Sequence, residues 1–164
     1  MTTPLLEGFA PVVDAGARLL ILGSFPSVQS LAAGQYYGNP RNAFWPITSA
    51  LFGFDAQATY ETRLAALQSH GVALWDVLHK CRRAGSSDAK IDPKSLVVNN
   101  FRQLFAAYRC ITRVYFNGQT ADRLFRRLVH TDAPVSYQLL PSTSPARAMP
   151  PGKKLDAWRV IARS

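Results

Sequence analysis

The chain has 164 residues, of which 48% are hydrophobic and 18% charged, and its formal net charge is +9. This composition predicts one globular domain over residues 1–164 and excludes a disordered chain, and apolar runs such as Leu19–Leu22 are too short to cross a membrane. The two cysteines, Cys81 and Cys110, indicate neither a disulfide framework nor a metal site.

Four short apolar segments predict buried strands. In chain order they are residues 17–23 (ARLLILG), 71–77 (GVALWDV), 111–118 (ITRVYFNG) and 135–141 (VSYQLLP). Segments with helical spacing occupy residues 43–53, 60–71, 95–108, 119–130 and 153–164, and residues 81–95 read as a long irregular loop. The alternation predicts an α/β fold, a three-layer α/β/α arrangement around a central four-stranded parallel sheet.

The charge is distributed unevenly along the chain. Residues 1–78 carry three basic and five acidic side chains, a balance of −2, whereas residues 79–164 carry sixteen basic and five acidic ones, a balance of +11. This asymmetry favours a polyanionic partner, with nucleic acid ahead of an acidic membrane surface. The alternative is a solvated basic surface without a partner.

Polar and turn-forming residues follow each predicted strand. These segments are GSFPS (23–27) with the aromatic GQYYGNPRNAFWPI (34–47), Asp76, FNGQT (116–120) and LPSTSPARA (140–148). In an open parallel sheet the ligand site lies outside the carboxyl ends of the strands. We therefore expect these segments to form one site.

Taken singly, each segment also has a structural interpretation. Asn42 precedes a helical run and is typical of a helix N-cap, and Asn39 before Pro40 is a common turn starter. The pair Asn117-Gly118 is typical of a turn, and the hydroxyl groups of PSTSP can bond to their own backbone. GSFPS matches neither of the glycine-rich nucleotide motifs, so no nucleotide cofactor is expected.

Together, GSFPS, YYGNPRNAFWPI, ALWDV, FNGQTA and LPSTSPA resemble, in order and spacing, the uracil-DNA glycosylase superfamily, and within it the hypoxanthine-DNA (deoxyinosine) glycosylase branch. The resemblance extends from about Leu19 to Trp158. It implies a DNA repair enzyme that flips a deaminated base and removes it by hydrolysis, leaving an abasic site. It also implies the same layered fold around a four-stranded parallel sheet.

The first loop departs from the superfamily pattern. Uracil- and mismatch-directed relatives carry a catalytic Asp or Asn there, and this chain has Phe25 at the matching position. The resemblance to the hypoxanthine branch moves the catalytic asparagine to the NPRN segment and so to Asn42, with Asn39 as the alternative. Relatives with an iron–sulfur cluster need four cysteines and are excluded, so we expect neither cofactor nor metal.

The chemistry of base excision suggests roles for the other candidates. An aromatic pocket of Phe25, Tyr36, Tyr37 and Phe44 suits the faces of a flipped base. Asn117 suits the base edge, because an amide pairs with the 6-oxo group and N1–H of hypoxanthine, whereas adenine offers the opposite pattern. Asp76 is a candidate general base. Ser24 is assigned to base binding with this group.

DNA contacts are expected from two regions. The PSTSPARA loop corresponds to the segment that enters the minor groove in relatives, where small residues allow close approach and Arg147 fills or flanks the gap. The DNA-binding candidates are Ser27, Ser142, Thr143, Ser144, Pro145, Arg147, Arg123 and Arg127. Arg123, Arg126 and Arg127 form either a phosphate clamp or simply a solvated helix face.

Two other functions remain open. The first is a glycosylase of the same fold directed to uracil or mismatched pyrimidines, and the second is a nucleic-acid-binding module without catalysis. The clustering of amides and aromatic rings at four strand ends favours the enzyme. We expect a cytoplasmic monomer that acts on DNA, because the start of the sequence, with Glu7 and Asp14, is not typical of a secretory leader.

Overall fold

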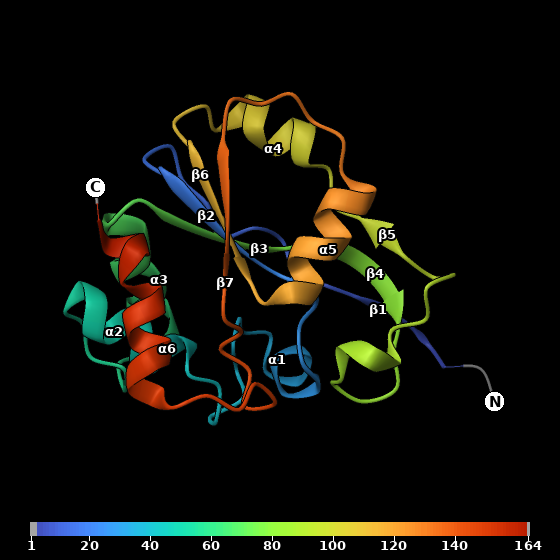
Figure 1. The fold of residues 1–164 in the computed structure, drawn as a ribbon, viewed down its shortest axis with the longest axis horizontal. Coiled ribbons are helices and arrows are strands. Elements are labelled where there is room, and N and C mark those ends of the chain that lie inside the picture. The colour runs from blue at the N-terminus through green and yellow to red at the C-terminus, as the bar shows by residue number, and fades with distance from the viewer. Residues whose placement is uncertain (1–2, 164) are drawn as a thin grey trace.

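The computed structural model describes residues 3–163. At its centre is a parallel sheet with the strand order β3-β2-β6-β7, and all four predicted strands are confirmed. The bounds are Leu19–Gly23 for β2, Val72–Asp76 for β3, Arg113–Asn117 for β6 and Ser136–Leu140 for β7. Because the strands are parallel, their carboxyl ends share one edge, the lower edge in Figure 1.

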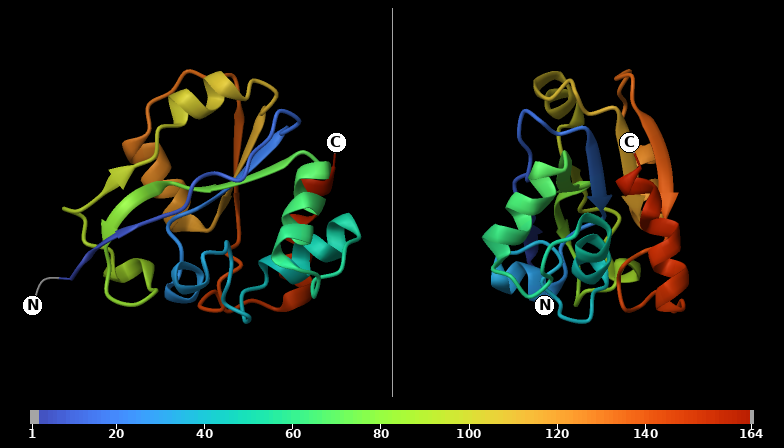
Figure 2. Two further views of the ribbon diagram at one scale, coloured as in Figure 1. Left: turned by 180° about the vertical axis from the view of Figure 1, so that it is seen from behind. Right: turned by 90° about the vertical axis from the view of Figure 1, so that its left-hand side faces the viewer.

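Two hydrophobic cores cover the two faces of this sheet. Successive side chains of a strand point to opposite faces, so Leu20 and Leu22 lie in the first core and Leu19 and Ile21 in the second. Helices α4 (Phe101–Ala107) and α5 (Gln119–Leu128) cover the first core; α2 (Phe44–Phe52), α3 (Tyr60–Ser69) and α6 (Pro151–Trp158) cover the second. Figures 1 and 2 show the two helix layers, and the predicted α/β/α arrangement is confirmed.

The predicted helices at residues 43–53, 60–71 and 119–130 are confirmed as α2, α3 and α5. A left-handed Gly53 ends α2, and the Thr59 side chain caps α3. The last helix begins at Pro151, earlier than predicted, and after Trp158 the chain continues as a 3₁₀ turn, Arg159–Ala162. A short helix not predicted, α1 (Val28–Ala33), follows the first loop and is capped by Ser27.

The prediction of one helix over residues 95–108 was wrong in its first half. Val97 and Val98 form strand β5, and the helix begins only at Phe101, where the Asn100 side chain accepts a hydrogen bond from the Gln103 amide at 3.1 Å. The β-branched pair suits a strand, and the asparagine cap sets the start of the helix.

A second, antiparallel sheet with the order β1-β4-β5 was not predicted. It consists of β1 (Leu5–Glu7), β4 (Leu78–Arg82) and β5 (Val97–Val98), and β4 follows β3 after a single residue, Val77. Part of the predicted loop 81–95 therefore belongs to β4, and residues 88–90 form a 3₁₀ turn.

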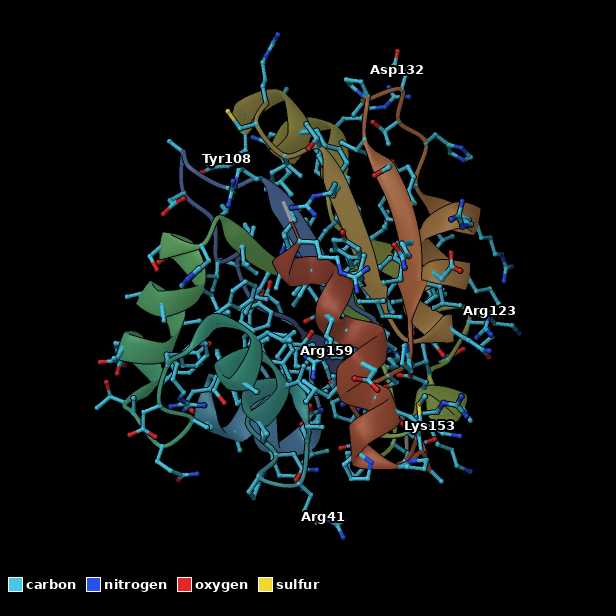
Figure 3. All side chains as sticks on the ribbon, turned by 60° about the vertical axis from the view of Figure 1, so that its left-hand side comes forward. Arg41, Tyr108, Arg123, Asp132, Lys153 and Arg159 are labelled. Atoms are coloured by element: carbon cyan, nitrogen blue, oxygen red, sulfur yellow. The ribbon has the colours of Figure 1, made fainter. Side chains whose placement is uncertain are left out.

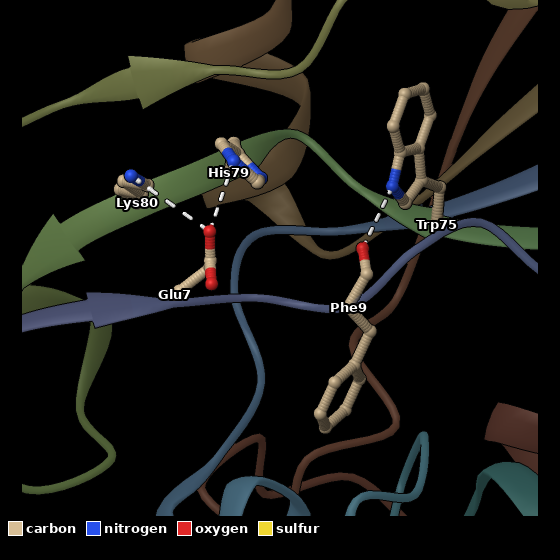
Figure 4. Close-up of polar contacts among 5 residues, drawn as sticks. All are labelled: Glu7, Phe9, Trp75, His79 and Lys80. Atoms are coloured by element: carbon tan, nitrogen blue, oxygen red, sulfur yellow. Dashed lines mark hydrogen bonds and ion pairs between the residues drawn. The ribbon is translucent and has the colours of Figure 1, made fainter.

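The amino-terminal segment is fastened to the strand pair β3–β4. Figure 4 shows Glu7 beside His79 and Lys80, at 3.4 and 3.8 Å, and the Trp75 indole donating to the Phe9 carbonyl at 3.1 Å. No helix within residues 3–163 combines the length and apolar composition that a membrane crossing requires.

Candidate active site

A cleft of about 1080 Å³ opens at the carboxyl edge of the parallel sheet. The last residues of its four strands, Gly23, Asp76, Asn117 and Leu140, all line the cleft. Most of the remaining lining comes from the segments that follow the strands and from one further loop, at residues 24–30, 36–42, 86–89, 118–120 and 141–149, and Leu139 and Ala157 complete it. The structure thus brings together the segments that follow the four predicted strands.

The floor of the cleft consists of Gly23, Tyr37 and Asp76. Gly23 pairs with Asp76 across β2 and β3, and a Cβ atom at Gly23 would lie 2.6 Å from Asp76 Oδ1 and 3.6 Å from the Tyr37 hydroxyl oxygen. Such a contact with the carboxylate is closer than real Cβ atoms make. The absence of a side chain at Gly23 therefore leaves room for the two polar groups above it.

Two polar atoms of this floor are buried without a hydrogen-bond partner among the described residues. They are Asp76 Oδ2 and the Tyr37 hydroxyl oxygen. Buried polar groups in native proteins are nearly always paired, and an unpaired one costs about 1–3 kcal/mol. Unpaired atoms that line a cleft are therefore candidates for ligand contacts.

Asp76 is 5% exposed. Its burial, with a smaller contribution from the Asp88 charge, raises its pKa to about 7, and the Arg83 guanidinium only partly opposes this. The carboxyl group can therefore change its charge near neutral pH. Neighbouring Trp75 is buried, and Asp76 itself lines the cleft.

Tyr37 has a strained backbone and a fixed ring. Its φ of +55° is the single positive value among the described non-glycine residues. The left-handed conformation costs a residue with a side chain roughly 1–2 kcal/mol. The ring is held by stacking on Phe44, with centroids 3.9 Å apart and 14° between the planes. Burial and the Asp76 charge raise the pKa of the hydroxyl, which stays a donor at neutral pH.

The other predicted aromatic residues occupy different places. Phe25 lines the cleft but is also part of the first core, below the Arg83 guanidinium at 5.3 Å. Tyr36 lines the cleft, and its hydroxyl donates to the Ala10 carbonyl at 2.7 Å. Phe44 is fully buried and lies outside the cleft, so the structure places it behind Tyr37 rather than against a ligand.

Asn39 and Asn42 both line the cleft. Asn42 Oδ1 accepts a hydrogen bond from the Phe44 amide at 2.9 Å, close to the capping role that its position suggested. Asn39 Oδ1 accepts from the Arg41 amide at 3.0 Å, and its carbonyl accepts from the Asn42 amide at 2.9 Å, closing a turn. Each carbonyl oxygen keeps a second lone pair, and each NH₂ group keeps its donors, for a ligand.

Asn117 lines the cleft and also bonds to the loop opposite. Its Nδ2 donates to Thr143 Oγ1 at 2.9 Å, and its Oδ1 accepts from the Thr143 amide at 2.8 Å. These two bonds join strand β6 to residues 141–150, which we call the rim loop. The amide keeps a second N–H and a second lone pair, so its contact with the base edge stays a prediction.

Ser24, predicted to bind the base, lines the cleft. The predicted DNA-binding residues separate into two groups. Ser27 and the rim loop line the cleft, the predicted rim-loop residues being Ser142, Thr143, Ser144, Pro145 and Arg147. Arg123 and Arg127 are exposed on α5 and outside the cleft. In Figure 3, Arg123 projects from the side of the molecule, whereas Arg41 and Lys153 lie near the lower end, where the cleft opens.

Sequence analysis missed one wall of the cleft, residues 86–89, which fell in the predicted irregular loop. Ser24 Oγ donates to Asp88 at 2.8 Å, and Ser86 Oγ accepts from the Val28 amide at 2.9 Å. Buried Arg83 donates to the Pro26 carbonyl at 2.7 Å and fastens the base of this wall to the first loop. A serine-rich loop without periodicity carried no signal of these contacts.

Within residues 3–163, no three His, Cys, Asp or Glu side chains gather closely enough to hold a metal ion together. The ionisable groups of the cleft that carry a shifted pKa are Asp76, Tyr36 and Tyr37. The arrangement therefore offers hydrogen bonding, a carboxyl group of adjustable charge and aromatic surface.

Comparisons with known proteins agree with this geometry. Residues 10–162 match the family model of the uracil DNA glycosylase superfamily. The chain is 33% identical to a hypoxanthine DNA glycosylase of Methanosarcina acetivorans, and the match covers 96% of this chain and 98% of that protein. It is 40% identical to a hypoxanthine DNA glycosylase of Methanosarcina barkeri, and that match covers 69% of this chain and 71% of the relative. A solution structure from M. acetivorans, described as a uracil DNA glycosylase, superposes with a TM-score of 0.78 at 31% identity, covering 98% of this chain and all of that one.

Proposed function

The chain belongs to the uracil DNA glycosylase superfamily, and we propose that it removes hypoxanthine from deoxyinosine in DNA by hydrolysis. Two relatives are named hypoxanthine DNA glycosylases, at 33% and 40% identity, which supports this substrate. The observation that carries the proposal is the pair of unpartnered polar atoms at the floor of the cleft, Asp76 Oδ2 and the Tyr37 hydroxyl.

The floor matches one edge of hypoxanthine. The Tyr37 hydroxyl donates to the 6-oxo group, and the ionised Asp76 carboxylate accepts from N1–H. Adenine presents a lone pair at N1, which the carboxylate repels, and an amino group in place of the oxygen. A site that leaves its polar groups unpaired with the wrong base discriminates strongly, because the loss is not offset by water.

The cleft also has surface for the faces of the base. The Tyr37 ring is immobilised by Phe44, and Phe25 presents a further apolar surface near the first loop. Taking a base out of the duplex costs a few kcal/mol, and stacking on aromatic side chains returns roughly 1–3 kcal/mol per base. A cleft of about 1080 Å³ has room for a nucleoside.

Hydrolysis breaks the bond between C1′ of the sugar and N9 of the base, while the oxygen of a water molecule bonds to C1′ and one of its protons ends on the released base. Asn42 and its neighbour Asn39 are the amides available to hold that water. Their backbones form one closed turn, tied to the rim loop by the Ala43 amide, which donates to the Thr143 carbonyl at 2.9 Å. A positioned amide of this kind contributes roughly 10²–10³-fold to rate.

In this proposal the rim loop binds phosphate groups of the DNA. The hydroxyl groups of Ser142 and Ser144 each accept from a backbone amide of the loop, and each keeps its O–H donor for a phosphate oxygen. We further propose that the protein acts as a monomer without a cofactor, because one cleft contains the groups that hydrolysis requires.

A second role for Asp76 is favoured by its pKa of about 7, which suits a general base at neutral pH. The two roles predict different results for Asp76→Asn. An amide accepts from N1–H and donates to the 6-oxo group, so a base reader keeps activity within about tenfold. A general base cannot be replaced by an amide, and activity would fall by roughly 10²–10⁴-fold on every lesion.

The experiment measures single-turnover excision from matched duplexes that contain one deoxyinosine, one deoxyuridine or one deoxyxanthosine, with alkali revealing abasic sites. Asn42→Ala is compared with Asn42→Ser, which keeps the capping oxygen but lacks the amide. Loss of inosine excision in both variants supports catalysis by Asn42, whereas recovery in the serine variant assigns only a capping role. Cleavage at uracil alone, or salt-sensitive binding without any product, would overturn the proposal.

A further inference from the structure

The rim loop is held from below by two side chains of helix α6. The Trp158 indole, fully buried, donates to the Pro141 carbonyl at 2.8 Å. Lys154 Nζ donates to the Arg147 carbonyl at 3.1 Å. Lys154 and Trp158 lie four residues apart and so share one face of the helix. Together they fix the first residue of the loop and a residue near its tip.

Lys154 is an unusual residue for this place. It is 5% exposed, although lysine is rarely buried without a charged partner. No carboxylate among the described residues lies within ion-pair distance of its ammonium group; the nearest acid on the helix, Asp156, pairs with Arg159 at 3.1 Å. Burial, with help from the Arg147 charge, lowers the pKa of Lys154. The side chain of Lys154 is packed into the protein, and its ammonium group ends against a carbonyl oxygen.

Simple packing does not require this arrangement. The same helix position would be filled at lower cost by a methionine, because burying an ammonium group without an anion is unfavourable. The bond that the ammonium makes is charge-assisted, about twice as strong as a neutral hydrogen bond. It ends on the backbone of Arg147, the residue whose side chain we assign to the gap left by the flipped base.

We propose that Lys154 is a positioning residue, which fixes the Arg147 end of the rim loop in the shape that enters duplex DNA. This inference rests on the proposed function, since it assumes that the loop works on a flipped base in a duplex. Lys154 does not touch the reacting atoms; it acts through the Arg147 backbone. The rim loop therefore has its DNA-binding shape already in the free protein, and no binding free energy is used to order it.

Excision from single-strand DNA distinguishes a positioning role of Lys154 from a general loss of enzyme stability. A duplex has a partner strand whose base must be kept from re-pairing and a gap that must be filled, whereas a single strand has neither. Loss of loop position therefore harms excision from the duplex more than excision from a single strand. Loss of overall stability harms both equally.

The test compares Lys154→Met with Lys153→Met, which removes the same charge one residue away, from an exposed side chain. We expect Lys154→Met to lower the ratio of duplex to single-strand inosine excision roughly tenfold or more, and Lys154→Arg to restore most of it. Lys153→Met removes a charge near the mouth of the cleft and so weakens binding of both DNA forms, but its ratio should stay near that of the wild type. Equal losses on both DNA forms, or no difference between the two methionine variants, would overturn the inference.

Amide hydrogen exchange of residues 141–150 in the free protein provides a measurement that needs no activity. Faster exchange of this segment in Lys154→Met, but not in Lys153→Met, is expected, and unchanged exchange contradicts the inference. If the wild-type protein releases no base from any DNA, the proposed function fails, and the exchange data still decide whether Lys154 holds the loop.

Discussion

The floor of the cleft and the rim loop place buried polar groups in opposite situations. At the floor, Asp76 Oδ2 and the Tyr37 hydroxyl have no partner among residues 3–163. In the rim loop, Thr143 is bonded through its hydroxyl, amide and carbonyl, and the loop is held by Asn117 of β6 and by Trp158 and Lys154 of α6. One region leaves hydrogen bonds for a ligand to complete, and the other has already completed its own.

The floor of the cleft is therefore suited to recognising a base, and the rim loop to holding one shape. Unpaired groups in a dry cleft discriminate between bases because a wrong ligand leaves them unpaired. A satisfied network holds one shape, because changing that shape exposes several polar groups at once. The strained backbone of Tyr37 belongs with the floor, where strain accompanies a ligand-facing side chain.

The largest effect is expected from filling the floor. Gly23→Ala places a Cβ atom where the Asp76 carboxylate lies, 2.6 Å away, so the carboxylate or the strand must move. We expect inosine excision to fall roughly hundredfold, since displacements of about 1 Å have such effects. Gly152→Ala, at an α6 position with open space around it, is the matched control and should leave excision unchanged. Equal activity of the two variants would show that the floor tolerates a methyl group.

The raised pKa of Asp76 makes the stability of the protein depend on pH. The folded state holds this proton up to about pH 7, whereas the unfolded chain releases it near 3.8, so the contribution of Asp76 to stability is most favourable below pH 4 and declines as pH rises toward 7. Between pH 5 and pH 8 this group contributes a loss of roughly 2–3 kcal/mol in the free energy of unfolding. Urea denaturation should show that loss in the wild type and a smaller one in Asp76→Asn; equal losses would contradict it.

A smaller effect is expected when the rim loop loses one bond. Thr143→Val keeps the size of the side chain and removes the hydroxyl that accepts from Asn117 at 2.9 Å. Because it leaves the buried amide nitrogen unpaired, we expect a loss of about 1–3 kcal/mol in stability and a several-fold loss in duplex excision. Thermal denaturation and single-turnover rates measure the two effects. Restored stability in Thr143→Ser would assign the loss to the hydroxyl.

The smallest expected effects concern the salt dependence of DNA binding. Arg147→Gln removes a charge at the cleft and should reduce the salt dependence of DNA binding by about one phosphate contact. Arg123→Gln removes an equal charge from the outer face of α5 and should change neither the salt slope nor excision by more than about twofold. Binding titrations at several salt concentrations check both. A lower slope for Arg123→Gln would restore the α5 arginines as a phosphate clamp.

The parallel sheet was predictable because its strands are short, apolar and separated by helical segments. Since parallel strands place their carboxyl ends at one edge, the convergence of the first loop, Asp76, Asn117 and the rim loop followed from the same pattern. The antiparallel sheet was not predictable, because β1 and β5 are three and two residues long and gain their pairing only from β4. Strands of this length are too short to show a hydrophobic periodicity in the sequence.

Side-chain roles were harder to predict than positions. Phe44 was expected to contact the base because it lies in an aromatic segment, yet helical geometry turns it into the core behind Tyr37. The bonds of Asn117 to Thr143, 26 residues later, were not predicted, and its contact with the base stays a prediction. The role proposed for Lys154 depends on its burial. The sequence shows two adjacent lysines, Lys153 and Lys154, and does not show that one of them is buried.

The near-continuous run from Val72 to Arg82 bears on how this protein folds. Its first half pairs with β2 in one sheet and its second half with β1 and β5 in the other, and only Val77 separates them. Neither sheet can be completed before this run is in place, and its partners are distant in sequence. Such non-local pairing slows folding to milliseconds or longer, because the chain must lose entropy in closing long loops before the stabilising contacts form. Asp76 is the last residue of β3, so the cleft floor forms only when β3 has paired with β2, and refolding monitored by base excision should lag behind helix formation.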